Sequence, residues 1–86
     1  MDVTQFESAV EKSKNFTKRP SNEELLQLYA LYKQATSGDI HGEKPGGFDF
    51  KAMAKFAAWE ELKGKSSDEA MQEYINLVDT LYKQYA

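Results

Sequence analysis

Residues 20–39 read PSNEELLQLYALYKQATSGD and contain the start, the body and the end of a helix. Ser21 and Glu24 have the S-x-x-E spacing of a capping box, which satisfies two of the free backbone amides at a helix start. Apolar and aromatic side chains then recur every three or four residues from position 25 to position 35, as on one helix face. Gly38 suits the left-handed conformation that follows a last helical turn. The stretch therefore predicts a helix over 22–36.

Three further segments, 4–16, 50–63 and 66–84, also have helical spacing. Thr4 with Glu7, Asp49, and the polar run from Ser66 are residues typical of helix starts. The last segment has the most regular period of 3.6 residues, and nowhere do apolar and polar residues alternate as in a half-buried strand. We therefore predict an all-α, four-helix bundle that occupies a single domain, 1–86. The loop 37–48 holds most of the glycines and is long enough to cross the domain.

Composition excludes several classes of protein. The 86 residues include no Cys and one His, which rules out disulfide scaffolds and thiolate metal sites. The 11 basic and 14 acidic residues give a net charge of −3, which argues against a nonspecific nucleic-acid binder. No secretory leader or transmembrane stretch is visible, so we expect a cytoplasmic protein. No metal or other cofactor is expected.

Few residues have a context that suggests catalysis. The sequence contains no nucleophile-elbow or phosphate-loop motif. Adjacent carboxylates such as Glu23 and Glu24 fall at helix starts, where they complement the helix dipole. His41 lies in the polar, glycine-rich loop, where solvation or a turn contact is the simpler interpretation. We expect that the protein is not an enzyme.

A more unusual feature is the group of phenols and ammonium groups on the helix over 22–36. Tyr29, Tyr32 and Lys33 are three or four residues apart, so their side chains lie side by side. Phenol rings can stack on a base, and an ammonium can hold a phosphate. The same spacing also fits tyrosines at the edge of a helix core. Both interpretations stay open on spacing alone.

Basic charge is distributed unevenly along the chain. Lys51 and Lys55 are four residues apart and project from one helix face, although lysine pairs are commonly just solvated. Lys14 belongs to the segment 12–19, which has four basic residues and no acid, whereas residues 66–86 carry four acids and one lysine. A local basic concavity is therefore compatible with an acidic protein.

Taken together, these residues form a pattern that resembles the acyl-CoA-binding proteins. The resemblance covers nearly the whole chain, and YxxYKQAT followed by AWxxLKG is highly specific. It rests on residues 20–39 and, downstream, on Pro45-Gly46, Asp49-Phe50-Lys51, Lys55, Ala58-Trp59, Leu62-Lys63-Gly64, Ser66 and Ala70-Met71-x-x-Tyr74-Ile75.

The resemblance implies an up-down-down-up bundle that binds, buffers and transports long-chain acyl-CoA esters inside the cell. Such a protein is a noncatalytic, monomeric carrier in fatty acid metabolism. It does not insert into membranes, and its contacts with membranes or with acyl-CoA-using enzymes are transient. The alternative is a helical protein–protein interaction module whose broad apolar arc docks a partner helix.

The resemblance also assigns roles to residues. Tyr29, Lys33 and Lys55 would grip the 3′-phosphate of CoA, and Tyr32 would help to stack the adenine. Lys14 and Lys51 would lie along the phosphates, and Tyr74 would close the site near the thioester. Ala30 and Leu31 fall within the same binding segment, and the acyl groove would be lined by Ala9, Leu25 and Leu26.

The sequence departs from the family pattern at a few positions. Phe56 stands where family members commonly have Trp, which keeps an aromatic plane and would alter chain-length preference at most. Lys44 replaces a commoner Arg, and Gly42 and Gly47 are additional glycines in the loop. These departures concern only details of the site and the loop.

Overall fold

The computed structural model describes residues 3–85. Its four helices are α1 (Val3–Lys12), α2 (Asn22–Ser37), α3 (Phe50–Glu60) and α4 (Ser67–Tyr85). No strand is present within the described part of the chain. The predicted all-α class is therefore confirmed.

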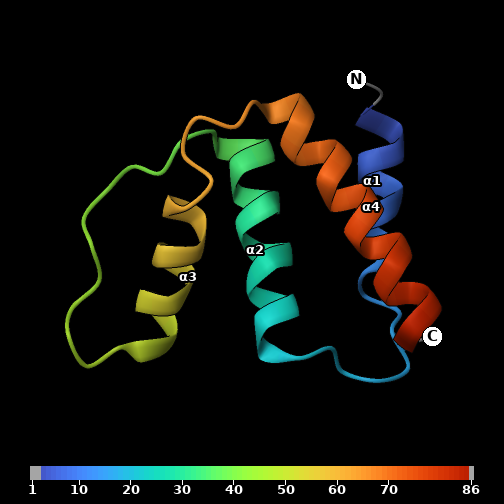
Figure 1. Ribbon diagram of the computed structural model, residues 1–86, viewed down its shortest axis with the longest axis horizontal. Helices are drawn as coiled ribbons and strands as arrows, with labels where there is room; N and C mark the ends of the chain where they lie inside the picture. The colour runs from blue at the N-terminus through green and yellow to red at the C-terminus, as the bar shows by residue number, and fades with distance from the viewer. Residues whose placement is uncertain (1–2, 86) are drawn as a thin grey trace.

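The helices form a flat assembly with α2 between α3 and α4, and with α1 packed on α4 (Figure 1). Its principal extents are 36 × 29 × 15 Å. Helices α2 and α3 run in the same direction, and α1 and α4 run in the opposite direction (Figure 1). This is the predicted up-down-down-up arrangement. The parallel α2–α3 pair requires the long connection 38–49, which returns along the full length of α3.

The core forms where α4 crosses α1 and α2. Buried residues recur along α4 at Ala70, Tyr74, Val78 and Leu81, which is the 3.6-residue period seen in the sequence. They pack with buried residues of α1 and α2, which are Phe6, Ala9, Leu28, Leu31 and Ala35. Helix α3 contributes one buried residue, Trp59, and packs mainly against α2.

Local caps define the helix starts that were predicted. The Ser21 hydroxyl accepts a hydrogen bond from the Glu24 amide at 3.1 Å, and the Glu24 carboxylate accepts one from the Ser21 amide at 2.9 Å. Asp49 accepts from the Ala52 amide at 3.0 Å, and Ser66 accepts from the Glu69 amide at 3.1 Å. These side chains satisfy amides that have no intrahelical partner.

Helix α1 differs from the predicted range 4–16 at both ends. It begins at Val3, so Thr4 lies inside the helix rather than at its cap. It ends at Lys12 because side chains bind the carbonyls of its last turn: Ser13 Oγ donates to Val10 O at 2.6 Å, and Asn15 Nδ2 donates to Glu11 O at 3.1 Å. Such bonds compete with continued helix.

Helix α3 ends at Glu60, before the predicted residue 63. The next amides form tighter bonds, from Leu62 to Trp59 O at 3.0 Å and from Lys63 to Glu60 O at 3.1 Å. Gly64 follows with a φ of 93°, which side chains rarely adopt. The predicted stop at Gly64 thus marks the end of this turn rather than of the regular helix.

A buried amide joins the C-terminal end of α2 to both neighbouring turns. Gln34 is fully buried, and its Nε2 donates to Asp39 Oδ1 at 2.8 Å and to Lys65 O at 2.7 Å. Asp39 Oδ1 also accepts from the Gly64 amide at 2.8 Å. These bonds lower the pKa of Asp39, the Gly64 amide contributing most. They hold the turn before α4 and the loop after α2 together.

Candidate ligand-binding site

A cavity of about 650 Å³ opens between α2, α3 and the segment before α2. Its lining combines three cationic side chains, one phenol and an aliphatic floor, with no carboxylate. The lining residues are Arg19, Asn22, Leu25, Leu26, Tyr29, Lys51, Ala54 and Lys55. A basic wall beside an aliphatic floor suits a ligand that has an anionic head and an apolar chain.

The pairing of Tyr29 with Lys55 joins the two helices at this cavity. The Lys55 ammonium lies 5.1 Å from the centre of the Tyr29 ring, within the range of a cation–π contact. The contact brings a cation and a phenol donor to one place on the wall. Residues 26 positions apart in the sequence meet here because α2 and α3 lie alongside each other.

One turn further along α2, Lys33 makes a similar contact. Its ammonium lies 4.9 Å from the Trp59 ring centre. Trp59 is buried, and its Nε1 donates to Gly38 O at 2.9 Å, so the ring is fixed. His41 packs edge-on against the same ring, with 5.6 Å between ring centres. His41 is thus exposed, and it contacts a ring of α3. Lys33 lies beyond the cavity lining.

Two predicted residues, Tyr32 of α2 and Tyr74 of α4, form a second group in an aromatic cluster with Phe6 of α1. Tyr32 stacks on Phe6 with 6.0 Å between ring centres, and Tyr74 packs edge-on against Phe6 at 5.2 Å. Tyr32 remains 40% exposed, whereas Tyr74 is buried. The ring centres of Tyr32 and Tyr74 are 6.3 Å apart. Tyr32 is thus the more exposed of these two tyrosines.

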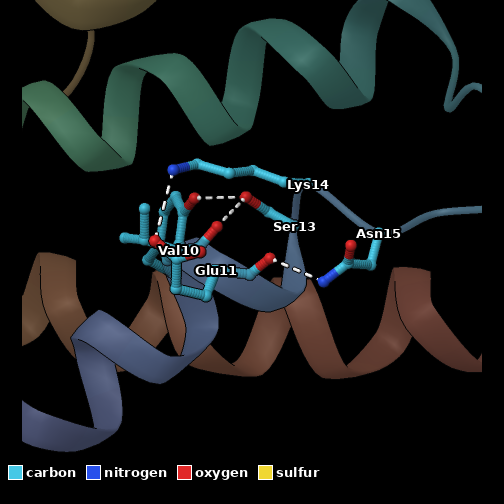
Figure 2. A network of polar contacts seen from close by, with 6 residues as sticks. Val10, Glu11, Ser13, Lys14 and Asn15 are labelled. Atoms are coloured by element: carbon cyan, nitrogen blue, oxygen red, sulfur yellow. Dashed lines mark hydrogen bonds and ion pairs between the residues drawn. The ribbon is translucent and has the colours of Figure 1, made fainter.

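A polar network surrounds Ser13 and Lys14 at the end of α1 (Figure 2), and Tyr74 of α4 joins it. Its hydroxyl donates to Ser13 Oγ at 3.2 Å. Lys14, the next residue, pairs with Glu11 at 3.2 Å, both side chains being exposed. Burial raises the pKa of Tyr74 above its ordinary value, and the Ser13 bond and Lys14 oppose the rise. Tyr74 therefore remains a neutral donor near neutral pH.

Some predicted site residues lie elsewhere. Ala9 is buried in the core and lines a cavity between α1 and α4 rather than the one with Leu25 and Leu26. Ala30 and Leu31 are buried and line a separate cavity of about 680 Å³ bounded by α2, α3 and α4. Phe56 is half-buried on α3.

The 680 Å³ cavity differs in charge from the cationic one. Its lining includes three carboxylates, Glu23, Glu61 and Glu73, together with alanines and leucines. Leu26 and Ala54 line both cavities and so separate them. An anionic head is attracted to the 650 Å³ cavity and repelled by the other.

Sequence reasoning did not assign Arg19, Asn22 or Ala54 to the site. Arg19 belongs to the basic segment 12–19, and nothing in the sequence singles out Ala54 as a binding residue. Asn22 carried no signal. Within residues 3–85, no three His, Asp or Glu side chains are grouped as metal ligands, and no helix is both long and apolar enough to cross a bilayer.

The fold and this site together define a class of small all-α ligand-binding protein. The family model described as "Acyl CoA binding protein" matches residues 3–78. The chain is 56% identical over 82 residues to an acyl-CoA-binding protein homolog of Drosophila melanogaster, covering 95% of each chain. It is 52% identical over 81 residues to the acyl-CoA-binding protein of Saccharomyces cerevisiae, covering 94% of this chain and 93% of the yeast protein.

Solved structures of the same family resemble the fold of this chain. The crystal structure of Oryza sativa acyl-CoA-binding protein 2 is similar with a TM-score of 0.91 and 43% identity, covering 95% of this chain and 91% of that one. The solution structure of the yeast acyl coenzyme A binding protein has a TM-score of 0.78 and 50% identity, with 98% of each chain covered. The chain belongs to the acyl-CoA-binding protein family.

Proposed function

We propose that the protein binds long-chain acyl-CoA esters in the 650 Å³ cavity and transports or buffers them without catalysis. The observation that carries this proposal is that the Lys55–Tyr29 pair lines the same cavity as Leu25 and Leu26. The pair offers donors to a phosphate, and the leucines offer an aliphatic surface to a chain. Family membership supports the same ligand.

Tyr29 and Lys55 are proposed to hold the 3′-phosphate of CoA, with Lys33 approaching from the next turn of α2. Charge-assisted bonds from ammonium groups to phosphate are about twice as strong as neutral ones. Lys51 and Arg19 extend the same basic wall and would lie along the remaining phosphates. No described carboxylate lines this cavity, so its cations are available to a ligand.

The second group is proposed to complete the head-group site. The partly exposed ring of Tyr32 would stack on the adenine, and Lys14 would reach the phosphates from the end of α1. Tyr74 would close the site through its buried hydroxyl. Ala30 and Leu31 would support the binding helix from its buried side, and Ala9 would do so from α1.

The acyl chain is proposed to lie on Leu25, Leu26 and Ala54. Each buried methylene contributes about 0.8 kcal/mol, so roughly a dozen would contribute at most about 10 kcal/mol. Nanomolar affinity corresponds to about 12 kcal/mol after association costs. The tail would thus supply most of the affinity, and the basic wall would select CoA esters over free fatty acids.

We further infer a monomer that works in the cytoplasm without metal or cofactor and contacts membranes or acyl-CoA-using enzymes only transiently. The alternative of a helical interaction module has less support. It was motivated by the broad apolar arc of α2, but Leu28 and Leu31 lie in the core and Leu25 and Leu26 in the cavity. The arc therefore needs no partner helix to explain it.

Calorimetry with palmitoyl-CoA, its 3′-dephospho analogue and free palmitate tests the proposal. Palmitoyl-CoA should bind most tightly, and loss of the 3′-phosphate should weaken binding at least tenfold. Lys55→Ala should remove this discrimination, whereas Lys83→Ala, an exposed lysine in the last turn of α4, should keep it. Equal affinity for the two CoA esters would overturn the role of Tyr29, Lys33 and Lys55. Steady release of free thiol would contradict the noncatalytic assignment.

A further inference from the structure

The connection from α1 to α2 forms part of the wall of the 650 Å³ cavity. Arg19 lies in this connection and Asn22 begins α2, and both line the cavity together with Lys51 and Lys55 of α3. Arg19 therefore lies on irregular backbone, whereas the two lysines belong to a helix. A cation on a flexible loop loses conformational freedom when it binds a ligand, and this loss weakens affinity. The contacts that hold the connection in place therefore matter to the site.

The last described residue of α4 holds the connection just before Arg19. The carbonyl oxygen of Tyr85 accepts hydrogen bonds from the Thr17 amide at 3.0 Å, from the Lys18 amide at 3.1 Å and from the Thr17 hydroxyl at 2.8 Å. The carbonyls of a last helical turn have no donor within the helix, so these bonds take none away from α4. Figure 1 shows the connection passing the C-terminal end of α4. The backbone is therefore fixed immediately before Arg19.

The side chain of Tyr85 contacts the chain on the other side of Arg19. The Tyr85 hydroxyl donates to Glu24 Oε1 at 2.8 Å, and Glu24 forms the capping box of α2 with Ser21. Pro20 lies between the two anchor points and is buried, and a proline restricts the residue before it to extended backbone. The stretch that contains Arg19 is thus bonded to Tyr85 at both ends.

The charges of the empty cavity oppose this arrangement. Arg19, Lys51 and Lys55 line one cavity, and no carboxylate among the described residues lines it with them. Like charges that are held together repel each other. A free connection would therefore carry Arg19 away from the lysines when no ligand is bound. A connection fixed by Tyr85 keeps Arg19 in place, so that folding rather than ligand binding overcomes the repulsion.

We propose that Tyr85 is a positioning residue for the basic wall and holds Arg19 at the cavity before a ligand arrives. Tyr85 is not part of the cavity lining and acts through the segment 17–24. The proposal rests on the proposed function for the identity of the ligand. The order of the Arg19 backbone in the ligand-free protein does not depend on acyl-CoA, so a failure of this proposal is distinguishable from a failure to bind acyl-CoA.

Thr17→Val with Tyr85→Phe tests the proposal, because this double variant lacks the hydroxyl donors at both anchor points. Thr80→Val with Tyr82→Phe is the matched control, since it removes the same two kinds of hydroxyl from α4 and leaves the bonds of Tyr85 intact. Nitrogen-15 relaxation of the ligand-free protein should give the Arg19 amide an order parameter of about 0.85 in wild type and in the control. The value should be lower in the test variant.

Calorimetry measures the consequence for the ligand. Palmitoyl-CoA should bind the test variant about three- to tenfold more weakly than wild type, and it should bind the control as tightly as wild type. In an Arg19→Ala background the same two test changes should cause little further loss, because the side chain that they position is already absent. Urea unfolding of each variant establishes that it is folded at the temperature of the titration, which separates lost affinity from lost folding.

Four results would overturn the proposal: an Arg19 amide that is equally ordered in wild type and in the test variant; an unchanged affinity of the test variant; an equal loss in the control; or the same loss in the Arg19→Ala background, as expected if Tyr85 only stabilises the fold. Should the test variant not fold, Tyr85→Phe alone is measured in the same way. It keeps the bonds of the Tyr85 carbonyl and should show a smaller loss that also disappears in the Arg19→Ala background.

Discussion

The ammonium group of Lys55 on α3 lies 5.1 Å from the ring centre of Tyr29 on α2. The contact links the two parallel helices beside the cationic cavity. It also places the phenol and the ammonium where both can donate to one phosphate. The proposed function therefore gives the ring two separable roles, to position Lys55 with its face and to bind ligand with its hydroxyl.

Tyr29→Phe and Tyr29→Leu separate these roles. Phe keeps the ring face and removes the hydroxyl, so affinity for palmitoyl-CoA should fall by about 0.5–1.5 kcal/mol, the value of one hydrogen bond. Leu also removes the cation–π contact and should weaken binding further. Calorimetry of both variants in the wild-type and Lys55→Ala backgrounds gives the coupling. If Leu and Phe weaken binding equally, the ring does not position Lys55.

The hydrogen bond of the Trp59 indole predicts an effect on stability. Trp59→Phe removes the hydrogen bond to Gly38 O and leaves that carbonyl without this donor. The free energy of unfolding should fall by about 1–3 kcal/mol. Urea denaturation measures the change, with Phe56→Leu as a comparison at a half-buried aromatic on the same helix. Unchanged stability of the Trp59 variant would show that the loop after α2 does not depend on this bond.

The helix starts could be predicted because they depend on local chemistry. The capping bonds of Ser21, Glu24 and Asp49 join residues only three positions apart, and the structure has these bonds. The end of α1 could not be predicted in the same way. Ser13 binds a carbonyl of α1 and also accepts from Tyr74, 61 residues later in the chain. Such a stop depends on tertiary packing.

The candidate site also combines features that the local sequence predicts with features that depend on tertiary packing. Spacing alone placed Tyr29, Tyr32 and Lys33 on one helix but left open whether the tyrosines were structural. In the structure Tyr29 faces α3, whereas Tyr32 joins the aromatic cluster with Phe6. The neighbours of α2 decide this difference. Arg19 lies outside every predicted helix, so periodicity gave no reason to bring it to the cavity.

Leu81 on α4 provides a test of the core. It is 1% exposed and belongs to the cluster that joins α1, α2 and α4. Leu81→Ala should lower the free energy of unfolding by about 2–5 kcal/mol, because the cavity adds to the lost transfer energy. Leu77→Ala, at a half-buried position on the same helix, should have a smaller effect in the same denaturation experiment. The reverse order would contradict this description of the core.

Glu24 predicts how stability depends on pH. Its carboxylate accepts from the Ser21 amide and from the Tyr85 hydroxyl at 2.8 Å, linking the start of α2 to the end of α4. The Ser21 amide, followed by Tyr85, holds the pKa of Glu24 below its ordinary value of 4.5. Because the folded pKa is the lower one, the stabilisation is fully present above pH 4.5 and is lost as the pH falls through the folded value.

Urea unfolding across acidic pH should therefore show a steeper loss of stability for wild type than for Glu24→Gln, and Tyr85→Phe should fall between them. Glu60→Gln, which changes an exposed carboxylate at the end of α3, is the matched control and should follow wild type. If Glu24→Gln gives the wild-type pH profile, these hydrogen bonds do not favour the ionised carboxylate.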